Sequence, residues 1–145
     1  MEIKFSAQTH TRSTEAEWTT LENYLIANGY NFDGTTSGNN IAKALTSDMG
    51  WTSSSDPGAV GNTDYPTYRN KSGFTALPGG ARDWNGVFGD IGIDGLWWSS
   101  TYFTYVPDGS TETAHFRGLC YNVAGVWGDT YYKEFGFSVR CVRDN

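Results

Sequence analysis

Two patterned segments near the end of the chain, GLWWSST at residues 95–101 and GFSVRCV at residues 136–142, decide the fold class. Both are rich in β-branched or aromatic side chains and begin with glycine, which is typical of short β-strands. The residues between them, 102–135, mix aromatic, glycine and small polar side chains, a composition typical of evolved binding surfaces. We therefore expect a sheet whose C-terminal part displays a variable-looking binding region.

Further strands are expected on either side of these segments. The Asn-Gly pair at residues 85–86 is a hairpin signal, because both central positions of such a turn need positive backbone φ angles. The expected strands are residues 3–5, as an edge strand pairing with the C-terminal strand, then 74–77, 96–101, 114–123, about 126–132, and 135–142.

A helix is expected over residues 15–28. Thr14 and Glu17 match the capping-box pattern, in which each side chain accepts a hydrogen bond from the other residue's backbone amide. Apolar residues then recur at three- and four-residue spacing, and Gly29 is suited to a left-handed stop.

A short second helix should end at Leu45. Asn39 or Asn40 can cap its first turn. The inward face of this helix would carry Ile41, Ala44 and Leu45.

The composition describes one aromatic-rich domain. The chain has 145 residues, of which 16% are aromatic and 18 are glycine, and this favours a turn-rich fold over a helical bundle. Residues 50–72 show neither helical nor strand periodicity and are expected to form a long irregular loop. We expect a single α+β domain over residues 1–145.

Charge and hydropathy argue against two classes of partner. The net charge is −6, the pI is about 4.7, and no basic run is present. Nucleic-acid affinity rests on lysine and arginine, so no nucleic acid is expected as a partner. No apolar window is long enough to span a bilayer, and the first residues lack the apolar core of a secretion signal, so no membrane insertion is expected.

Four blocks in order carry a family resemblance: TEAEW at 14–18, GFTALPGGAR at 73–82, WWSST at 97–101 and GFSVRCV at 136–142. Over residues 13–144 the chain resembles the Fibrobacter succinogenes major paralogous domain, a module of bacterial surface proteins and lipoproteins. That family is similar in fold to C-type lectins and to formylglycine-generating enzymes. The resemblance implies two helices packed on a small twisted antiparallel sheet with long irregular loops.

The chain also resembles the variable proteins of diversity-generating retroelements, whose C-type-lectin domain ends in a hypervariable ligand-binding stretch. This resemblance implies a display or adhesion domain of a bacterial or phage surface protein, located on the cell or virion surface as part of a larger protein. Residues 116–122 alternate with period two, so neighbouring positions face opposite sides of a strand. The odd-numbered Arg117, Leu119 and Tyr121 resemble scaffold, and Phe116, Gly118, Cys120 and Asn122 form the outward set.

The expected binding face continues beyond that strand. The alternative is that its aromatic side chains simply pack against one another. The candidate ligand-binding residues are Tyr102, Phe103, Tyr105, Phe116, Gly118, Cys120, Asn122, Val123, Gly125, Trp127, Asp129, Thr130, Tyr131 and Tyr132. A protein or another surface macromolecule is the expected partner, and no cofactor is expected.

The same alternation of odd- and even-numbered residues along a strand predicts the positions of two residue pairs. Trp97 and Trp98 point to opposite faces, so at most one of them lies fully in the core. Cys120 and Cys141 fall on opposite faces, which argues against a disulfide and predicts a buried thiol at Cys141 and an exposed one at Cys120. Three arginines are candidates for buried salt bridges, with a structural rather than a catalytic role, namely Arg12, Arg82 and Arg140.

Metal binding and catalysis are weaker alternatives. Asp83, Asn85, Asp90 and Asp94 crowd a glycine-rich segment and could bind calcium through oxygen, but they miss the EF-hand spacing and suit a solvated turn better. The Glu-Pro-Asn and Gln-Pro-Asp tripeptides of sugar-binding C-type lectins are absent. The chain lacks a serine nucleophile elbow and a phosphate loop, so we expect no enzyme. The open alternatives are a formylglycine-generating-like enzyme and a purely structural module of a surface lipoprotein or pilus tip.

Overall fold

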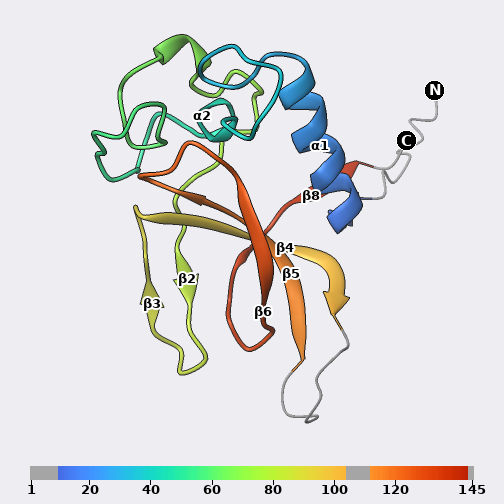
Figure 1. Cartoon of the computed structure of the whole chain (residues 1–145). Helices are drawn as coiled ribbons and strands as arrows, with labels where there is room; N and C mark the ends of the chain where they lie inside the picture. The colour runs from blue at the N-terminus through green and yellow to red at the C-terminus, as the bar shows by residue number, and fades with distance from the viewer. Residues whose placement is uncertain (1–9, 104–111, 144–145) are drawn as a thin grey trace, which may run out of the picture.

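The computed structural model describes residues 10–103 and 112–143 (Figure 1). The predicted edge strand at residues 3–5 lies outside this range. The elements, in chain order, are β1 (His10–Arg12), α1 (Glu15–Ala27), α2 (Ala42–Leu45), the 3-10 turn η1 (Pro66–Tyr68), β2 (Ala81–Arg82), β3 (Phe88–Gly89), β4 (Asp94–Phe103), β5 (Thr113–Cys120), β6 (Trp127–Tyr132), β7 (Ser138–Val139) and β8 (Cys141–Arg143).

Helix α1 begins where the capping box predicts. Glu17 N donates to Thr14 Oγ1 over 3.2 Å, and Thr14 N donates to Glu17 Oε2 over 2.7 Å. Gly29 follows the helix with a φ of 71°, a left-handed conformation that glycine adopts without strain. The predicted helix and its start are confirmed, and its end at Ala27 lies one residue before the predicted end.

Helix α2 has the predicted buried face but a different start. Ile41, Ala44 and Leu45 are all buried. The predicted asparagine cap is wrong, because Ile41 is the N-cap and makes no side-chain capping bond. Asn39 instead exchanges two hydrogen bonds with Val126 in the loop before β6, at 2.9 and 3.0 Å.

Residues 50–72 form the predicted long loop, and a buried cation holds it in place. The side chain of Lys43 is fully buried and forms a salt bridge with Asp64. Its ammonium also donates to the carbonyls of Asn62 at 2.9 Å and Asp64 at 2.6 Å. Burial lowers the pKa of Lys43 despite the carboxylate beside it. The loop is therefore ordered by internal polar contacts with α2.

A four-stranded sheet in the order β6-β5-β4-β7 forms the centre of the molecule. Strands β4, β5 and β6 are antiparallel neighbours, whereas β7 runs parallel to β4. Strands β2 and β3 form the hairpin predicted by the Asn-Gly pair. The predicted strand at 74–77 is only an isolated bridge between Ala76 and Thr46.

The last predicted strand is divided in two. Residues 135–142 do not form one strand, because β7 joins the central sheet and β8 pairs with β1 in a separate two-stranded sheet. The chain therefore changes sheets between Val139 and Cys141.

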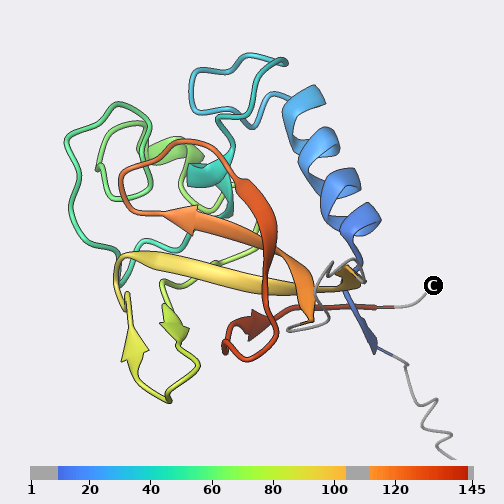
Figure 2. The same ribbon diagram turned by 60° about the horizontal axis from the view of Figure 1, so that its bottom comes forward.

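Two layers cover the two faces of the central sheet (Figure 2). Helix α1 and the long loops lie on one face, which we call the helix face. The β2–β3 hairpin and the segment leading to β7 lie on the other, which we call the aromatic face. The fold is thus α+β, with a helical layer on one side of a small mixed sheet. Of the helices described, none combines the length and apolar character needed to cross a bilayer.

Candidate ligand-binding surface

The period-two alternation of β5 places its side chains on two faces of the sheet. Both faces pack against other parts of the protein, so neither is fully exposed to solvent. Phe116 is paired with Trp98, whereas Arg117 is paired with Trp97 and Leu119 with Gly95. Directly opposed residues share a face. The helix face therefore carries Trp97, Arg117 and Leu119, and the aromatic face carries Trp98 and Phe116.

Phe116 and Gly118 correct the predicted outward set. Phe116 is only 2% exposed, and Gly118 is also buried. The reason is long-range, since residues 133–137 fold back over this face and bring Phe137 to 4.3 Å from Trp98, ring centroid to centroid. A strand pattern alone does not reveal such a cover.

Phe116 is the buried centre of an aromatic cluster. Its ring lies 5.0 Å from that of Trp127, 5.2 Å from Phe137 and 6.2 Å from Tyr131, in edge-to-face geometry. Such pairs contribute roughly 0.5–1.5 kcal/mol each beyond simple burial. A Cβ atom at Gly118 would overlap the Trp127 indole, so glycine is required there for the indole to lie flat on the strand. The prediction that one of the two neighbouring tryptophans is buried is confirmed, since Trp97 is 7% exposed and Trp98 is half-buried.

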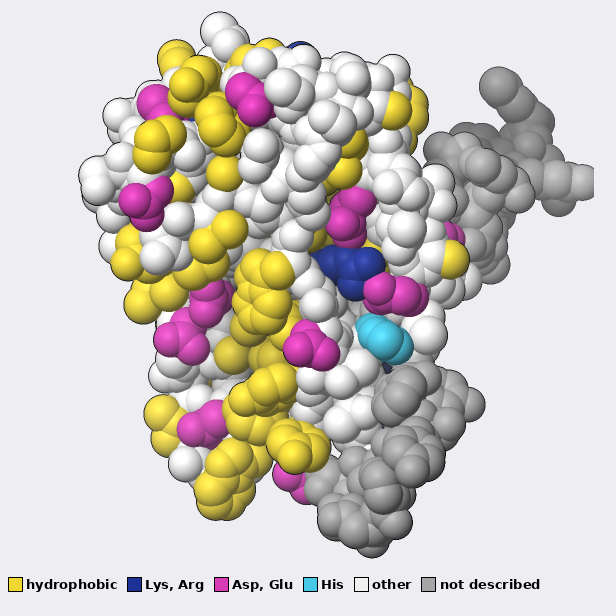
Figure 3. Space-filling model, viewed as in Figure 1, with side chains coloured by type: hydrophobic (Ala, Val, Ile, Leu, Met, Phe, Trp, Pro, Cys, Tyr) yellow, Lys and Arg dark blue, Asp and Glu magenta, His cyan; other side chains and the backbone are white. Residues whose placement is uncertain are grey.

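The solvent side of this cluster and the neighbouring hairpin turn carry exposed aromatic side chains. We call Trp84, Trp127, Tyr131 and Tyr132 the aromatic stripe; they are 68%, 41%, 41% and 51% exposed. Figure 3 shows hydrophobic side chains gathered in a column over β6 and the hairpin. A hollow at the hairpin end is lined by Trp84, Tyr131, Tyr132, Glu134 and Phe135.

Sequence reasoning missed Trp84 because it belongs to the hairpin turn, far from the predicted binding region. Asp83 Oδ1 accepts from the amides of Asn85 at 3.1 Å and Val87 at 2.8 Å, and Gly86 has a φ of 95°. Trp84 is the second residue of this turn, and its side chain is 68% exposed. The Asp-Trp-Asn-Gly order contains the signal, because Asp and Asn-Gly mark a turn and turns lie at the protein surface.

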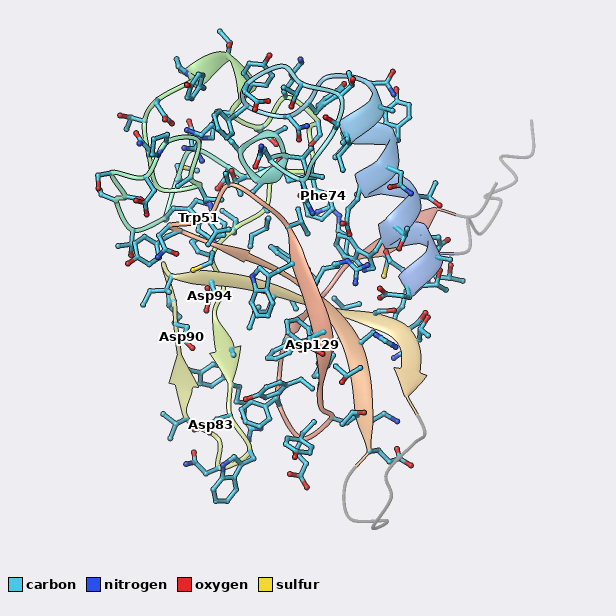
Figure 4. The ribbon with its side chains drawn as sticks, in the orientation of Figure 1. Trp51, Phe74, Asp83, Asp90, Asp94 and Asp129 are labelled. Carbon is cyan, nitrogen blue, oxygen red and sulfur yellow. The ribbon has the colours of Figure 1, made fainter. Side chains whose placement is uncertain are left out.

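The acidic residues near the hairpin do not converge on one point. Figure 4 shows Asp83 at the hairpin tip, Asp90 and Asp94 further along, and Asp129 apart from them on β6. Among the described residues, no group of three or more His, Cys, Asp or Glu side chains is placed to hold a metal ion. Asp83 instead has the ordinary turn role described above.

Arg117 anchors β5 to α1, in agreement with its predicted scaffold role. Its Nε donates to Glu22 Oε1 over 2.6 Å, and its Nη2 lies 2.5 Å from Glu15 Oε1. Burial disfavours its charge, but the hydrogen bonds that it donates to both carboxylates outweigh this and raise the pKa of Arg117.

The predicted buried salt bridges of the other arginines are wrong. Arg12, Arg82 and Arg140 are all exposed. Arg140 lies over the ring of Phe74, 4.4 Å from its centroid. Instead, Arg117 on β5 forms the ion pairs that link the sheet to α1.

The cysteines are free and far apart in the topology. Cys120 is half-buried at the end of β5, where its thiol lies 3.1 Å from Asn122 Oδ1. Burial, and then the nearby Asp94, raise the pKa of Cys120. The predicted buried thiol at Cys141 is wrong: Cys141 is exposed, because β8 leaves the central sheet to pair with β1.

The remaining candidate residues lie in three places. Asp129 is exposed on β6 and accepts from Thr130 N over 2.7 Å, and Thr130 is half-buried. Asn122 and Val123 are exposed and Gly125 half-buried in the β5–β6 loop, which is fixed by Ala42 N donating to Ala124 O over 2.9 Å. Tyr105 lies outside the described residues. Tyr102 and Phe103 belong to β4, and only their backbone is described.

Comparison with known families gives one match. The family model described as the Fibrobacter succinogenes major domain matches residues 11–143, nearly the whole chain. Searches of curated proteins and of solved structures gave no match.

Proposed function

The chain belongs to the Fibrobacter succinogenes major domain family, and from that premise we propose that it is a non-enzymatic ligand-binding domain. Its ligand would be a protein or another surface macromolecule, held by the aromatic stripe through shape and hydrogen-bond complementarity. The localisation that accompanies this proposal is the bacterial or phage surface, as part of a larger protein. This location rests on the family resemblance.

The observation that carries the proposal is the double aromatic layer. Exposed Trp127 and Tyr131 rest directly on buried Phe116, at 5.0 and 6.2 Å between ring centroids. Rings fixed in this way lose little freedom when a ligand covers them, which lowers the entropic cost of binding. Tyrosine and tryptophan also combine a large apolar surface with a polar tip. The stripe therefore has the makeup of a preformed binding surface.

The arrangement of the cysteines supports binding over formylglycine-generating chemistry. That chemistry is expected to need a closely placed cysteine pair. Cys120 ends β5 in the central sheet, whereas Cys141 begins β8 in a separate sheet with β1. We therefore propose no catalytic residue for this chain.

A finer proposal concerns the C-type-lectin-like fold and sequence diversification. The exposed positions of the β5–β6 loop and β6, such as Asn122, Asp129 and Tyr132, have side chains that make few buried contacts. Beneath them, Phe116 and Gly118 form a buried support that packs against Trp127 and does not rely on ring contacts with Asn122, Asp129 or Tyr132. A surface of this kind suits a variable protein of a diversity-generating retroelement, because display residues can change while the fold is kept.

Selection of binders from displayed libraries tests the proposed function. A random peptide library and a glycan array would be probed with the wild-type protein, with Trp84→Ser/Tyr132→Ser, and with Tyr24→Ser as the matched control. Tyr24 is 60% exposed on α1, remote from the stripe. We expect binders that are lost in the double variant and kept in the control. Binders that recognise all three proteins equally would contradict the proposal.

A further inference from the structure

We propose that the occupant of the aromatic stripe is a polypeptide segment bearing lysine or arginine side chains. This inference rests on the proposed function and names the chemistry of the ligand. It follows from the negative charges that surround the stripe and from the ion pairs that Lys133 and Arg117 already form.

Carboxylates lie along the whole length of the stripe. Asp129 stands on β6 between Trp127 and Tyr131 in sequence, and Glu134 lines the hollow that contains Trp84 and Tyr132. Figure 3 shows acidic side chains on both flanks of the hydrophobic column. A ligand on the stripe therefore meets several negative charges in addition to the rings.

Two of the basic side chains close to these carboxylates, Lys133 and Arg117, are already paired with acidic residues. Lys133 Nζ lies 2.6 Å from Glu112 Oε2. Arg117 is held between Glu15 and Glu22, so this cluster remains negative overall. Arg82 is exposed on β2, and its guanidinium lies beside Gly86 at the hairpin turn. The surface that remains for a partner is acidic.

The negative potential continues beyond the Trp127 end of the stripe. A second hollow there is lined by Trp127, Asp129, Glu15 and Glu22, together with Arg117 and other residues of β5 and β6. Glu15 Oε2 is buried and has no hydrogen-bond partner among the described residues. An ammonium or guanidinium group in this hollow would meet a net negative charge, because the carboxylates of Glu15, Glu22 and Asp129 line it with only one guanidinium.

Aromatic rings beside carboxylates favour a cationic polypeptide over other macromolecules. A guanidinium or ammonium group gains from the ring face and from charge-assisted hydrogen bonds to the carboxylates. A nucleic acid would be repelled by the same carboxylates. A neutral glycan would cover them without supplying a compensating charge, and desolvating unpaired charges is costly. The charge complementarity therefore selects a basic protein segment.

Titration with defined peptides tests this inference. The probes are an acetylated, amidated peptide of alternating arginine and glycine, its glutamine counterpart, and cellohexaose, each followed by the indole N–H signals of Trp84 and Trp127 in NMR spectra. The test protein is Asp129→Asn/Glu134→Gln, and the matched control is Asp48→Asn/Asp56→Asn. Both variants lose two exposed carboxylates and have the same net charge.

We expect the arginine peptide to shift both indole signals, and the glutamine peptide to leave them unchanged. Affinity should fall about fivefold in the stripe variant, from two lost charge contacts, and stay near the wild-type value in the control. An equal loss in both variants would mean unspecific attraction and would overturn the inference. A response to cellohexaose alone would also overturn it, while the proposed binding function would stand. If none of the three probes binds, the inference is wrong, and the library selection described above tests the proposed function independently.

Discussion

The two faces of the central sheet are both packed, but they are closed to different degrees. On the helix face, Trp97 and Leu119 join Trp18, Leu25 and Ile41 in a core whose members are at most 7% exposed. On the aromatic face, Phe116 is equally buried, yet the rings that cover it are 41% exposed at Trp127 and Tyr131. The helix face is therefore buried by other segments of the chain, whereas the aromatic face leaves a large apolar surface exposed to water.

This difference indicates how the sheet divides its roles. Buried apolar area stabilises the fold by about 25 cal/mol per Å², and the helix face gains this for its core side chains, such as Trp97 and Leu119. Exposed apolar patches on a soluble domain are typical of interaction sites. We infer that the helix face holds the fold together, and that the aromatic face uses Phe116 to support a surface that a partner can complete.

The largest expected effect comes from removing the support of the aromatic face. Phe116→Ala should lower the free energy of unfolding by about 3–5 kcal/mol, because a buried ring leaves a cavity among four neighbouring rings. Urea denaturation measures this change. A loss below about 1 kcal/mol would show that the aromatic face is not a core, and would remove the two-layer interpretation.

A comparable but smaller effect is expected on the helix face. Leu119→Ala should cost about 2–5 kcal/mol, because Leu119 is 2% exposed within the core against α1. The same denaturation series gives this value. An effect near zero would place Leu119 outside the core and would mean that the register of β5 is shifted by one residue.

Removing the most exposed part of the stripe should hardly affect folding. Trp84→Ser/Tyr132→Ser should lower the free energy of unfolding by less than about 1 kcal/mol, since both side chains are at least half in water. Thermal unfolding followed by circular dichroism provides the readout. A collapse of the transition would assign these residues to the core and remove the distinction between support and display.

The smallest expected effects are on the pH dependence of the free energy of unfolding, and they come from two carboxylates, Asp64 and Asp94. Burial opposes the charge of Asp64 in the loop layer, but hydrogen bonds from Lys43 and the Gly58 amide outweigh it and lower its pKa below 3.8. Burial raises the pKa of Asp94, which begins β4 opposite Cys120. The stabilisation from Asp64 is complete above pH 3.8 and is lost as pH falls through its lower folded-state pKa. Asp94 has the opposite effect, because its buried charge destabilises the fold. This destabilisation is present above the raised pKa of Asp94 and disappears as the pH falls towards 3.8.

Urea titrations between about pH 2 and pH 7 distinguish these contributions. Asp64→Asn should flatten the loss of stability below pH 3.8. Asp94→Asn should remove a gain that the wild type shows as the pH falls towards 3.8. Identical pH profiles for both variants would contradict the opposite environments assigned to these two carboxylates.

Local signals in the sequence were enough to predict the framework. The capping box at Thr14 and Glu17 located α1, and the Asn-Gly pair located the hairpin. The alternation along β5 correctly separated Phe116 from Arg117 and Leu119. Each of these depends on neighbouring residues, so each can be read from a short stretch.

What the sequence did not reveal depends on contacts between distant segments. Parity separates the two faces of β5 but does not say which face the chain later covers, and so Phe116 was assigned to solvent. Phe137 reaches it only because residues 133–137 fold back. Likewise, Trp84 joins Tyr132 because the hairpin lies beside that segment, with Arg82 N donating to Gly136 O over 2.9 Å.

Sequencing this gene in many related strains or phages tests the central claim most directly. The claim is that a fixed aromatic support carries a display surface that can change. It predicts substitutions concentrated at exposed positions such as Asn122, Asp129, Tyr131 and Tyr132, with Phe116 and Gly118 unchanged. Substitutions spread evenly over the chain, or concentrated at Phe116 and Gly118, would contradict the claim.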